Sequence, residues 1–377
     1  MKFTISARDG GARAGIIETD HGAVPTPAFM PVGTAGSVKA LEAREVEALG
    51  GRILLANAYH LYLRPGTDTL RAMGGLHRFM AWERPLLVDS GGYQVHSLAA
   101  IRTVSEEGVT FRSHIDGSEH IFTPEKVIEI QRAIGADFVM PLDHLVGWPA
   151  DRLVAAEAAE RTWRWVLRGR DAFEAGEPLY GHEQVLVPIL QGSFFRDLRR
   201  EQAEKMAGLD ALAYAVGGLT VGEESEQTRE AIEISLGPLP EDRPRYAMGV
   251  GTPDDLLAAV ALGVDLFDCV VPTRNGRNAT LFTFQGRINI RNARFARDER
   301  PVDESCPCPL CTTYSRAYLR HLFMAGELLA LKLGSAHNLC TYFRLLDEAR
   351  ERIRAGTFHP WAETAGRRMN SRAEEDA

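Results

Sequence analysis

Short apolar runs that end in polar residues or glycine alternate with longer segments of helical spacing along most of the chain. Runs of this kind lie at residues 29–33, 53–57, 86–89, 138–143, 185–191, 214–218, 246–250 and 264–268. Strands that alternate with helices are typical of parallel βα units. Because eight such units can close on themselves, the pattern predicts an α/β protein with a (β/α)8 TIM barrel.

Helices are expected between these runs, at residues 38–49, 124–134, 153–173 and 253–262. Thr123 and Thr252 each precede a proline, as an N-cap does when proline occupies the first helical position. The barrel is expected to be irregular for two reasons. Segment 103–122 contains turn residues typical of hairpins, and Pro141 and Pro188 lie inside predicted strands.

The ends of the predicted strands carry most of the candidate chemistry. These positions are Asn57, Asp89, Asp143, Gln191, Gly217, Gly218 and Asp268. Active sites of such barrels lie at the C-terminal ends of the strands, so these groups should meet at one mouth. A single acid at a strand end is typical of a loop cap, whereas three acids at corresponding positions favour a functional site.

The segment after Asp268 is basic. Pro272 and Gly276 are expected to end the last strand and open a loop. Residues 273–300 contain seven arginines and only two acidic residues, Asp298 and Glu299, which gives a local charge of +5 (7 − 2). Arginine side chains suit phosphates, although a solvated charged face has the same composition.

A cysteine cluster follows the basic segment. Cys306, Cys308 and Cys311 lie within six residues, and 25 residues separate Cys311 from His337. Three thiolates and one imidazole complete a tetrahedral structural zinc site. His321 and Cys340 also lie near enough in sequence to supply the fourth ligand. Helices are expected on either side of His337, at 315–333 and 338–355.

The composition is that of an ordinary folded protein. The chain has 377 residues, of which 45% are hydrophobic and 25% charged. We expect a barrel at 1–272, a basic zinc-binding helical subdomain at 273–355 and a C-terminal tail at 356–377. The N-terminus lacks the apolar core of a signal peptide, which predicts a cytoplasmic protein. A net charge of −8 argues against a general nucleic-acid coat, so RNA contact would need a local basic patch.

Together these motifs closely resemble the bacterial-type tRNA-guanine transglycosylases, also called queuine tRNA-ribosyltransferases. The resemblance covers about residues 29–346. It rests on Asp89-Ser-Gly-Gly-Tyr-Gln, Gln191-Gly-Ser, Val216-Gly-Gly-Leu-Thr-Val-Gly-Glu, Met248-Gly-Val-Gly, Phe267-Asp-Cys-Val-Val-Pro-Thr-Arg and the Cys/Cys/Cys/His set. It implies a pentosyltransferase that exchanges guanine at the anticodon wobble position of tRNA for a 7-deazaguanine base in queuosine biosynthesis. It also implies a homodimer with one structural zinc ion per subunit.

The resemblance also implies roles for single residues. Asp268 would attack the ribose C1′ and form a covalent ribosyl-enzyme, and Asp89 would carry protons to and from the bases. Two displacements would retain the configuration of the sugar, as in retaining glycosidases. Polar contacts to the base would come from Asp143, Gln191, Gly218, Leu219, Ser90 and Asn57. Tyr93 and Met248 would sandwich its faces, and Arg274 and Arg277 would hold the flanking nucleotides.

Two departures from the family pattern bear on the base pocket. His144 and Leu145 follow Asp143, where many bacterial members have glutamate and cysteine. Family members that accept the small 7-aminomethyl-7-deazaguanine precursor have valine where those that take queuine tend to have glycine. By this resemblance Val221 implies the precursor, while direct use of queuine is the alternative. A non-catalytic tRNA-binding partner subunit is disfavoured because both Asp89 and Asp268 are present. An ordinary barrel glycosidase or nucleosidase would not need the zinc-binding appendage.

Overall fold

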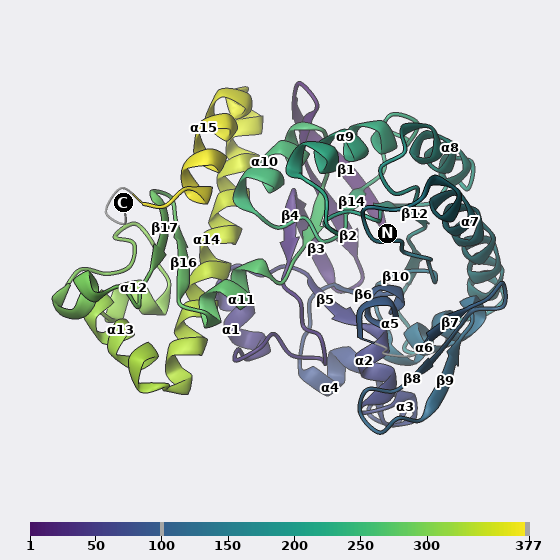
Figure 1. The fold of residues 1–377 in the computed structure, drawn as a ribbon, viewed down its shortest axis with the longest axis horizontal. Coiled ribbons are helices and arrows are strands. Elements are labelled where there is room, and N and C mark those ends of the chain that lie inside the picture. The colour runs from purple at the N-terminus through teal and green to yellow at the C-terminus, as the bar shows by residue number, and fades with distance from the viewer. Residues whose placement is uncertain (99–101, 374–377) are drawn as a thin grey trace.

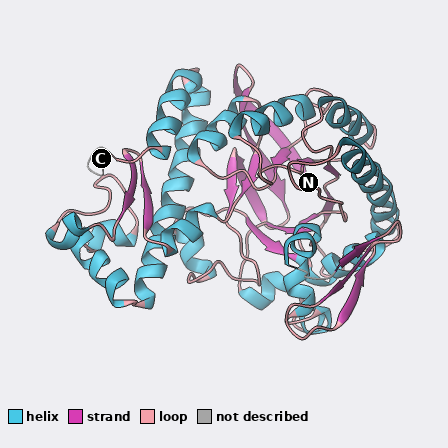
Figure 2. Cartoon of the chain, in the orientation of Figure 1, coloured by secondary structure: helices cyan, strands magenta, loops and turns pink. Residues whose placement is uncertain are grey.

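Two parallel sheets form the centre of the molecule in the computed structural model, which describes residues 1–98 and 102–373 (Figures 1 and 2). The first sheet has the order β11(Val185–Leu186), β10(Phe138–Val139), β6(Leu86–Asp89), β5(Leu54–Asn57). The second has the order β12(Ile189–Leu190), β13(Tyr214–Val216), β14(Arg245–Ala247), β15(Leu266–Asp268), β4(Ala28–Met30). Every predicted strand run therefore contains a parallel strand, and the fold is a mixed α/β structure.

The two sheets approach each other at both ends. On one side Leu55 donates a 3.1 Å hydrogen bond to the carbonyl of Pro31, next to a parallel bridge between Val32 and Leu55. On the other side only two residues separate β11 from β12. Pro188 has no N–H to donate, which accounts for the break there, but its carbonyl accepts from Ala215 N at 2.9 Å.

Helices follow the strands and cover their outer side. They are α6(Pro124–Ile134), α7(Arg152–Glu174), α8(Arg196–Ala207), α9(Ser225–Leu236) and α10(Pro253–Ala261). In Figure 1 helices α7, α8 and α9 lie along the edge of the molecule, outside the strands. Both predicted caps are confirmed: Thr123 Oγ1 accepts from Lys126 N and Thr252 Oγ1 accepts from Asp255 N, each at 3.2 Å. Hydrogen bonds at the caps therefore fix where α6 and α10 begin.

Two antiparallel sheets and several short helices complete the part of the molecule that contains the parallel sheets. An N-terminal sheet that the sequence did not predict contains β1(Lys2–Asp9), β2(Ala12–Thr19) and β3(Gly22–Thr26). The hairpins expected within 103–122 are present as β7(Arg102–Val104), β8(Val109–Arg112) and β9(Glu119–Phe122). The short helices are α1(Ala43–Ala48), α2(Ala58–Leu63), α3(Thr67–Ala72), α4(Gly75–Met80) and α5(Gly92–Leu98).

The chain after Asp268 builds a second lobe, on the left in Figure 1. Its elements are α11(Val271–Arg277), β16(Thr280–Thr283), β17(Gly286–Asn289), the 3-10 turn η1(Ala293–Arg297), α12(Pro309–Thr313), α13(Arg316–Ala325), α14(Leu328–Ala355) and α15(Phe358–Asn370). The prediction of a loop after Pro272 is wrong, because α11 occupies that segment. Proline lacks an N–H but is tolerated in the first turn of a helix, where N–H groups have no helical partner.

Helix α14 is continuous through residues 333–338, where the sequence suggested a break. Gly334 does not end the helix because it serves the packing of α14 against α11. A Cβ atom on Gly334 would lie 2.4 Å from the carbonyl oxygen of Gly276, and a Cβ on Gly276 would lie 2.5 Å from the carbonyl oxygen of Gly334. The two helices therefore cross at backbone contact, which only glycine allows.

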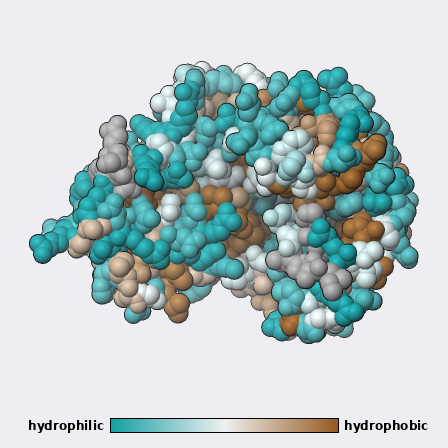
Figure 3. Space-filling view, viewed as in Figure 1, coloured by the Kyte–Doolittle hydropathy of each residue, from teal (hydrophilic) through white to brown (hydrophobic). Residues whose placement is uncertain are grey.

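The second lobe has its own cluster of buried apolar side chains, separate from the clusters around the parallel sheets. It includes Leu281, Ile288, Phe295, Leu310 and Leu319. The segment expected as a C-terminal tail contains α15, in which Phe358 and Met369 are buried. The visible surface is largely hydrophilic, with apolar areas near the middle (Figure 3). Among the described residues, every helix is too short or too polar to cross a bilayer.

Candidate active site

A cavity of about 680 Å³ opens at the C-terminal ends of the parallel strands. It brings together the polar groups that end five of the strands and the loops that follow them. The predicted residues in its wall are Asn57, Asp89, Ser90, Tyr93, Asp143, Gln191, Gly218, Leu219, Val221, Met248, Asp268 and Arg274. The expected convergence of the strand ends is therefore present in the structure.

Asp89 is buried at the end of β6 and accepts hydrogen bonds on both oxygens. Ala58 N donates to Oδ1 at 3.0 Å, and Gln94 Nε2 donates to Oδ2 at 2.9 Å. The amide of Asn57 donates to Oδ2 as well. Burial raises the pKa of Asp89 to about 6, against the effect of these donors, and the negative charge of Asp268 adds to the rise. Asp89 can therefore gain or lose a proton near neutral pH.

Asp268, at the end of β15, is held from one side. Tyr246 Oη donates to Oδ1 at 2.6 Å and Gly249 N donates to the same oxygen at 2.8 Å. Burial raises the pKa of Asp268, and these two donors oppose that rise. The neighbouring thiol of Cys269 also lines the cavity, but burial raises its pKa to about 11, so it stays protonated. Asp268 thus lines the cavity with one carboxylate oxygen held by two donors.

Asp143 is positioned between two polar side chains. Ser90 Oγ donates to Oδ1 and Gln191 Nε2 donates to Oδ2, both at 2.7 Å. Burial raises the pKa of this carboxyl group too. Gln191 lies directly against the glycine pair after β13, since a Cβ on Gly218 would be 2.5 Å from Gln191 Oε1. Carboxylate, amide and exposed backbone thus form one polar wall.

A buried cation supports that wall from behind. The guanidinium of Arg199 donates to the carbonyl oxygens of Gly217 at 3.1 Å and Gly218 at 3.0 Å. Burial lowers the pKa of Arg199 to about 10, which still leaves it charged at neutral pH. Arg199 therefore fixes the path of the Gly217–Gly218 backbone.

The other predicted residues divide between the cavity and its surroundings. Tyr93 is 56% exposed, and Met248 lies in the same cavity wall. Leu145 also lines the cavity. His144 instead turns toward α7, where Thr162 Oγ1 accepts from its N–H and Trp165 lies near its ring. Arg277 lies one helical turn beyond Arg274 on α11, outside the cavity wall.

Comparisons with known proteins show to which family this chain belongs. A family model described as queuine tRNA-ribosyltransferase matches residues 9–371. A protein of that name from Solidesulfovibrio magneticus is 50% identical over 356 residues, which cover 94% of each chain. Its namesake from Zymomonas mobilis subsp. mobilis is 49% identical over 363 residues, or 96% of this chain and 94% of its own. The chain belongs to the queuine tRNA-ribosyltransferase family. The predicted family is confirmed, and with it the enzyme class, a pentosyltransferase.

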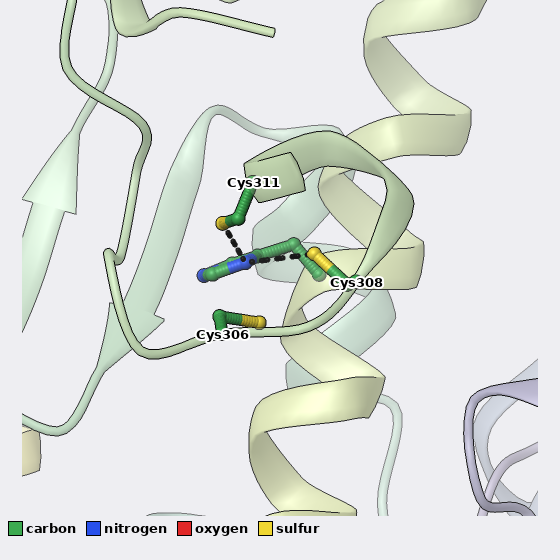
Figure 4. A group of neighbouring side chains, drawn as sticks. Cys306, Cys308 and Cys311 are labelled. Atoms are coloured by element: carbon green, nitrogen blue, oxygen red, sulfur yellow. Dashed lines mark hydrogen bonds between the residues drawn. The ribbon is translucent and has the colours of Figure 1, made fainter. Parts of the chain in front are cut away.

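This family member also has the predicted thiol and imidazole cluster. Ligand atoms of Cys306, Cys308, Cys311 and His337 all lie within 4.8 Å of one another. His337 Nδ1 is 3.5 Å from Cys308 Sγ and 3.3 Å from Cys311 Sγ, and Figure 4 shows the cysteines around this ring. Nε2 of His337 donates to the carbonyl of Phe282 at 2.8 Å, which leaves Nδ1 free to bind a metal. The cluster could therefore hold a metal ion.

Neither of the two alternative ligands belongs to the four-residue cluster. Cys340 Sγ is 3.9 Å from Cys306 Sγ but is not part of the four-residue group. His321 lies on α13, where its ring is near that of Tyr318. The donor set of three sulfurs and one nitrogen matches that of structural zinc sites.

Sequence reasoning missed three residues that shape the cavity of this enzyme. Tyr246 and Gln94 donate to the two central carboxylates, and Arg199 supports the glycine pair. Tyr246 could have been found from strand alternation, because it precedes Met248 by two positions in the predicted strand run 246–250. Arg199 carries no such signal, since it lies on a helix with the composition of a charged surface.

Proposed function

We propose that this protein exchanges guanine at the anticodon wobble position of tRNA for a 7-deazaguanine base. The observation that carries the proposal is the pair of carboxylates in one cavity with different surroundings. Asp268 has fixed donors on one oxygen only, whereas Asp89 is deeply buried, with a pKa raised to about 6 by burial and by Asp268. Such a pair suits a nucleophile and a proton carrier.

The proposed reaction has two displacements at the ribose C1′. A carboxylate oxygen of Asp268 attacks C1′ and the bond to guanine breaks, while Asp89 gives its proton to the leaving base. Asp89 then takes a proton from the incoming base, whose nitrogen attacks C1′ and releases Asp268. Each displacement inverts the carbon, so the two together retain its configuration.

The polar wall would recognise the edge of the base. Asp143 and Gln191 bond to each other at 2.7 Å and both face the cavity with Ser90 and the glycine pair. A flat base needs hydrogen bonds in its plane and apolar contacts on its faces, and Tyr93 and Met248 can supply the faces. Asn57 would act through Asp89, to which it donates. Arg274, in the cavity wall, is suited to a flanking phosphate, with Arg277 beside it on α11.

The proposed architecture is an irregular eight-stranded barrel with zinc in the second lobe. Two features support the barrel, because each connects the two parallel sheets. They are the Val32–Leu55 bridge and the gap of only two residues between β11 and β12. Supporting zinc is the Cys3His donor set. By family resemblance we also propose a homodimer and a cytoplasmic location, with residues 273–355 as the basic subdomain that meets tRNA.

For the incoming base we propose the aminomethyl precursor. Val221 lines the cavity, and its N–H donates to Glu223 Oε2 at 2.8 Å, which holds the loop in place. A branched side chain on a fixed loop leaves less room than glycine would, which disfavours the bulkier queuine. Direct use of queuine is the alternative, because Leu145, which stands where many bacterial members have cysteine, also lines the pocket.

Entry of labelled guanine into tRNA tests the proposal. Asp268→Asn should retain tRNA binding, since the arginines remain, but lose exchange and the covalent adduct. Exchange by this variant near the wild-type rate would refute the role of Asp268. Binding of tRNA without exchange by the wild-type protein would favour a non-catalytic partner subunit, and release of base without replacement would favour a nucleosidase.

A further inference from the structure

Three histidines from distant parts of the chain meet at the end of the strands opposite the cavity. His21 lies in the turn between β2 and β3, His77 on α4, and His182 just before β11. One ring nitrogen of each lies within 4.8 Å of the others. Asp137, which directly precedes β10, lies beside them. Since Asp89 and Asp143 follow the other ends of β6 and β10, this cluster is separate from the active site.

Each imidazole is oriented by a hydrogen bond to a backbone carbonyl or to the carboxylate of Asp137. His182 Nε2 donates to the carbonyl of Gly135 at 3.1 Å, and His77 Nδ1 donates to that of Trp82 at 2.9 Å. His21 Nδ1 lies 2.7 Å from Asp137 Oδ1. Carbonyl and carboxylate partners of this kind orient metal-binding histidines, and here they leave His21 Nε2 and His182 Nδ1 for a metal. His77 Nε2 lies 3.2 Å from Asp137 Oδ2, and a bound ion would take the place of that contact.

The surroundings hold these rings in place. Tyr180, two residues before His182, packs so closely on Gly135 that a Cβ there would lie 2.5 Å from its ring. The rings of His21 and His77 stack with centroids 3.8 Å apart. Asp137 is 2% exposed and also accepts from Leu86 N at 2.8 Å, so its position is fixed by the strand ends. The fold therefore brings the three imidazoles close together before an ion binds, which lowers the entropic cost of binding one.

The cluster is also open and suitably charged. His21 and His77 keep 23% and 13% of their side-chain surface exposed, so an ion can enter from solvent. Asp137 lies in contact with two of the rings, and Asp20 precedes His21. These carboxylates would offset the charge of a divalent cation.

We propose that His21, His77 and His182 form a second metal site, for a divalent transition metal such as zinc. Imidazole nitrogens suit zinc, copper and nickel, and a water molecule can complete a tetrahedral shell with three histidines. The bound ion would link the N-terminal sheet to α4 and to the segment before β11. Because these ligands meet only in the folded chain, the ion stabilises the native state.

Zinc titration of the full-length protein tests the site. The protein is first shown by metal analysis to hold about one equivalent in the Cys3His cluster. Calorimetry with added zinc should then show about one further equivalent, and zinc should raise the melting temperature. His182→Gln and His21→Gln should each weaken this second binding by about tenfold or more. His359→Gln, at an exposed histidine on α15, is the matched control and should bind zinc as the wild type does.

Two outcomes would overturn the proposal. A wild-type protein that takes up no further zinc would show that the histidines form a hydrogen-bonded clasp only. Second-site binding unchanged in both His182→Gln and His21→Gln would place the ion elsewhere. Circular dichroism and guanine exchange should remain at wild-type level in both variants, which separates loss of the ion from loss of the fold and from failure of the proposed function.

Discussion

The hydroxyl of Tyr246 donates a 2.6 Å hydrogen bond to Oδ1 of Asp268. Burial raises the pKa of Tyr246 well above its usual value, and the charge of Asp268 adds to this, so the hydroxyl remains a donor. With Gly249 N on the same oxygen, the bond leaves Oδ2 as the oxygen available for attack. Tyr246 is therefore a positioning residue for the proposed nucleophile.

Tyr246→Phe should lower kcat/KM for tRNA by about 10- to 100-fold, since a hydrogen bond to a charged group contributes about 1.5–3 kcal/mol. Affinity for tRNA should change little, because the arginines are untouched. Tyr214→Phe is a matched control: Tyr214 is equally buried, but its hydroxyl accepts from Ala211 N away from the cavity. An exchange rate in Tyr246→Phe equal to that of this control would contradict the positioning role.

The two half-reactions should respond to pH in opposite directions. Burial and the charge of Asp268 raise the pKa of Asp89 to about 6. In the proposed mechanism Asp89 is protonated to expel guanine and ionised to accept a proton from the incoming base. Adduct formation in single-turnover experiments should therefore slow as pH rises through about 6, whereas its resolution by added base should speed up. The midpoint for resolution should be lower, because Asp268 carries no charge in the adduct. Adduct formation independent of pH would exclude Asp89 as the acid.

Gly334→Ala should destabilise the protein by about 1–3 kcal/mol through overpacking, since its Cβ would lie 2.4 Å from the carbonyl oxygen of Gly276. Urea unfolding measures the change. Gly237→Ala serves as the control, because its Cβ would meet no atom closer than 3.7 Å and its backbone is already helical. Equal stability of the two variants would show that α11 and α14 can separate without cost.

Loss of metal from the Cys3His cluster should unfold the second lobe and weaken tRNA binding. Cys308→Ser should lower the zinc content and expose residues of this lobe to proteolysis. Cys340→Ser should retain the metal, since Cys340 lies outside the four-residue group. Folded, active protein with less than about half an equivalent of zinc would contradict a structural role.

Val221→Gly should shift base selection toward queuine. Removing a branched side chain from the cavity wall makes room, and discrimination by shape of this kind amounts to about 10- to 200-fold in kcat/KM. Competition of the two bases for the tRNA adduct measures the shift. A wild-type enzyme that already prefers queuine would overturn the proposed choice of precursor.

The strand pattern was enough to place Asp89, Asp143, Gln191 and Asp268 at one mouth, because parallel strands bring their ends together. Contacts between distant segments were not accessible in this way. Helices were expected to stop at 333 and restart at 338, because the contact of Gly334 with Gly276 is visible only in the fold. The N-terminal sheet escaped notice because the side chains of β1 alternate only between exposed and half-buried. Positions 21, 77 and 182 share no motif, so only the fold reveals their histidines as neighbours.

Helix α14 carries His337 of the thiol cluster and, within two turns, Asn338 and Tyr342. Asn338 Nδ2 donates to the carbonyl of Pro272 at 2.9 Å, and Tyr342 Oη donates to that of Gly251, in the cavity wall, at 2.7 Å. Helix α14, which rises about 1.5 Å per residue, is uninterrupted and thus contacts both lobes. Movement of one lobe against the other at this junction would have to break such contacts, so the shape of the cavity is tied to the position of the second lobe.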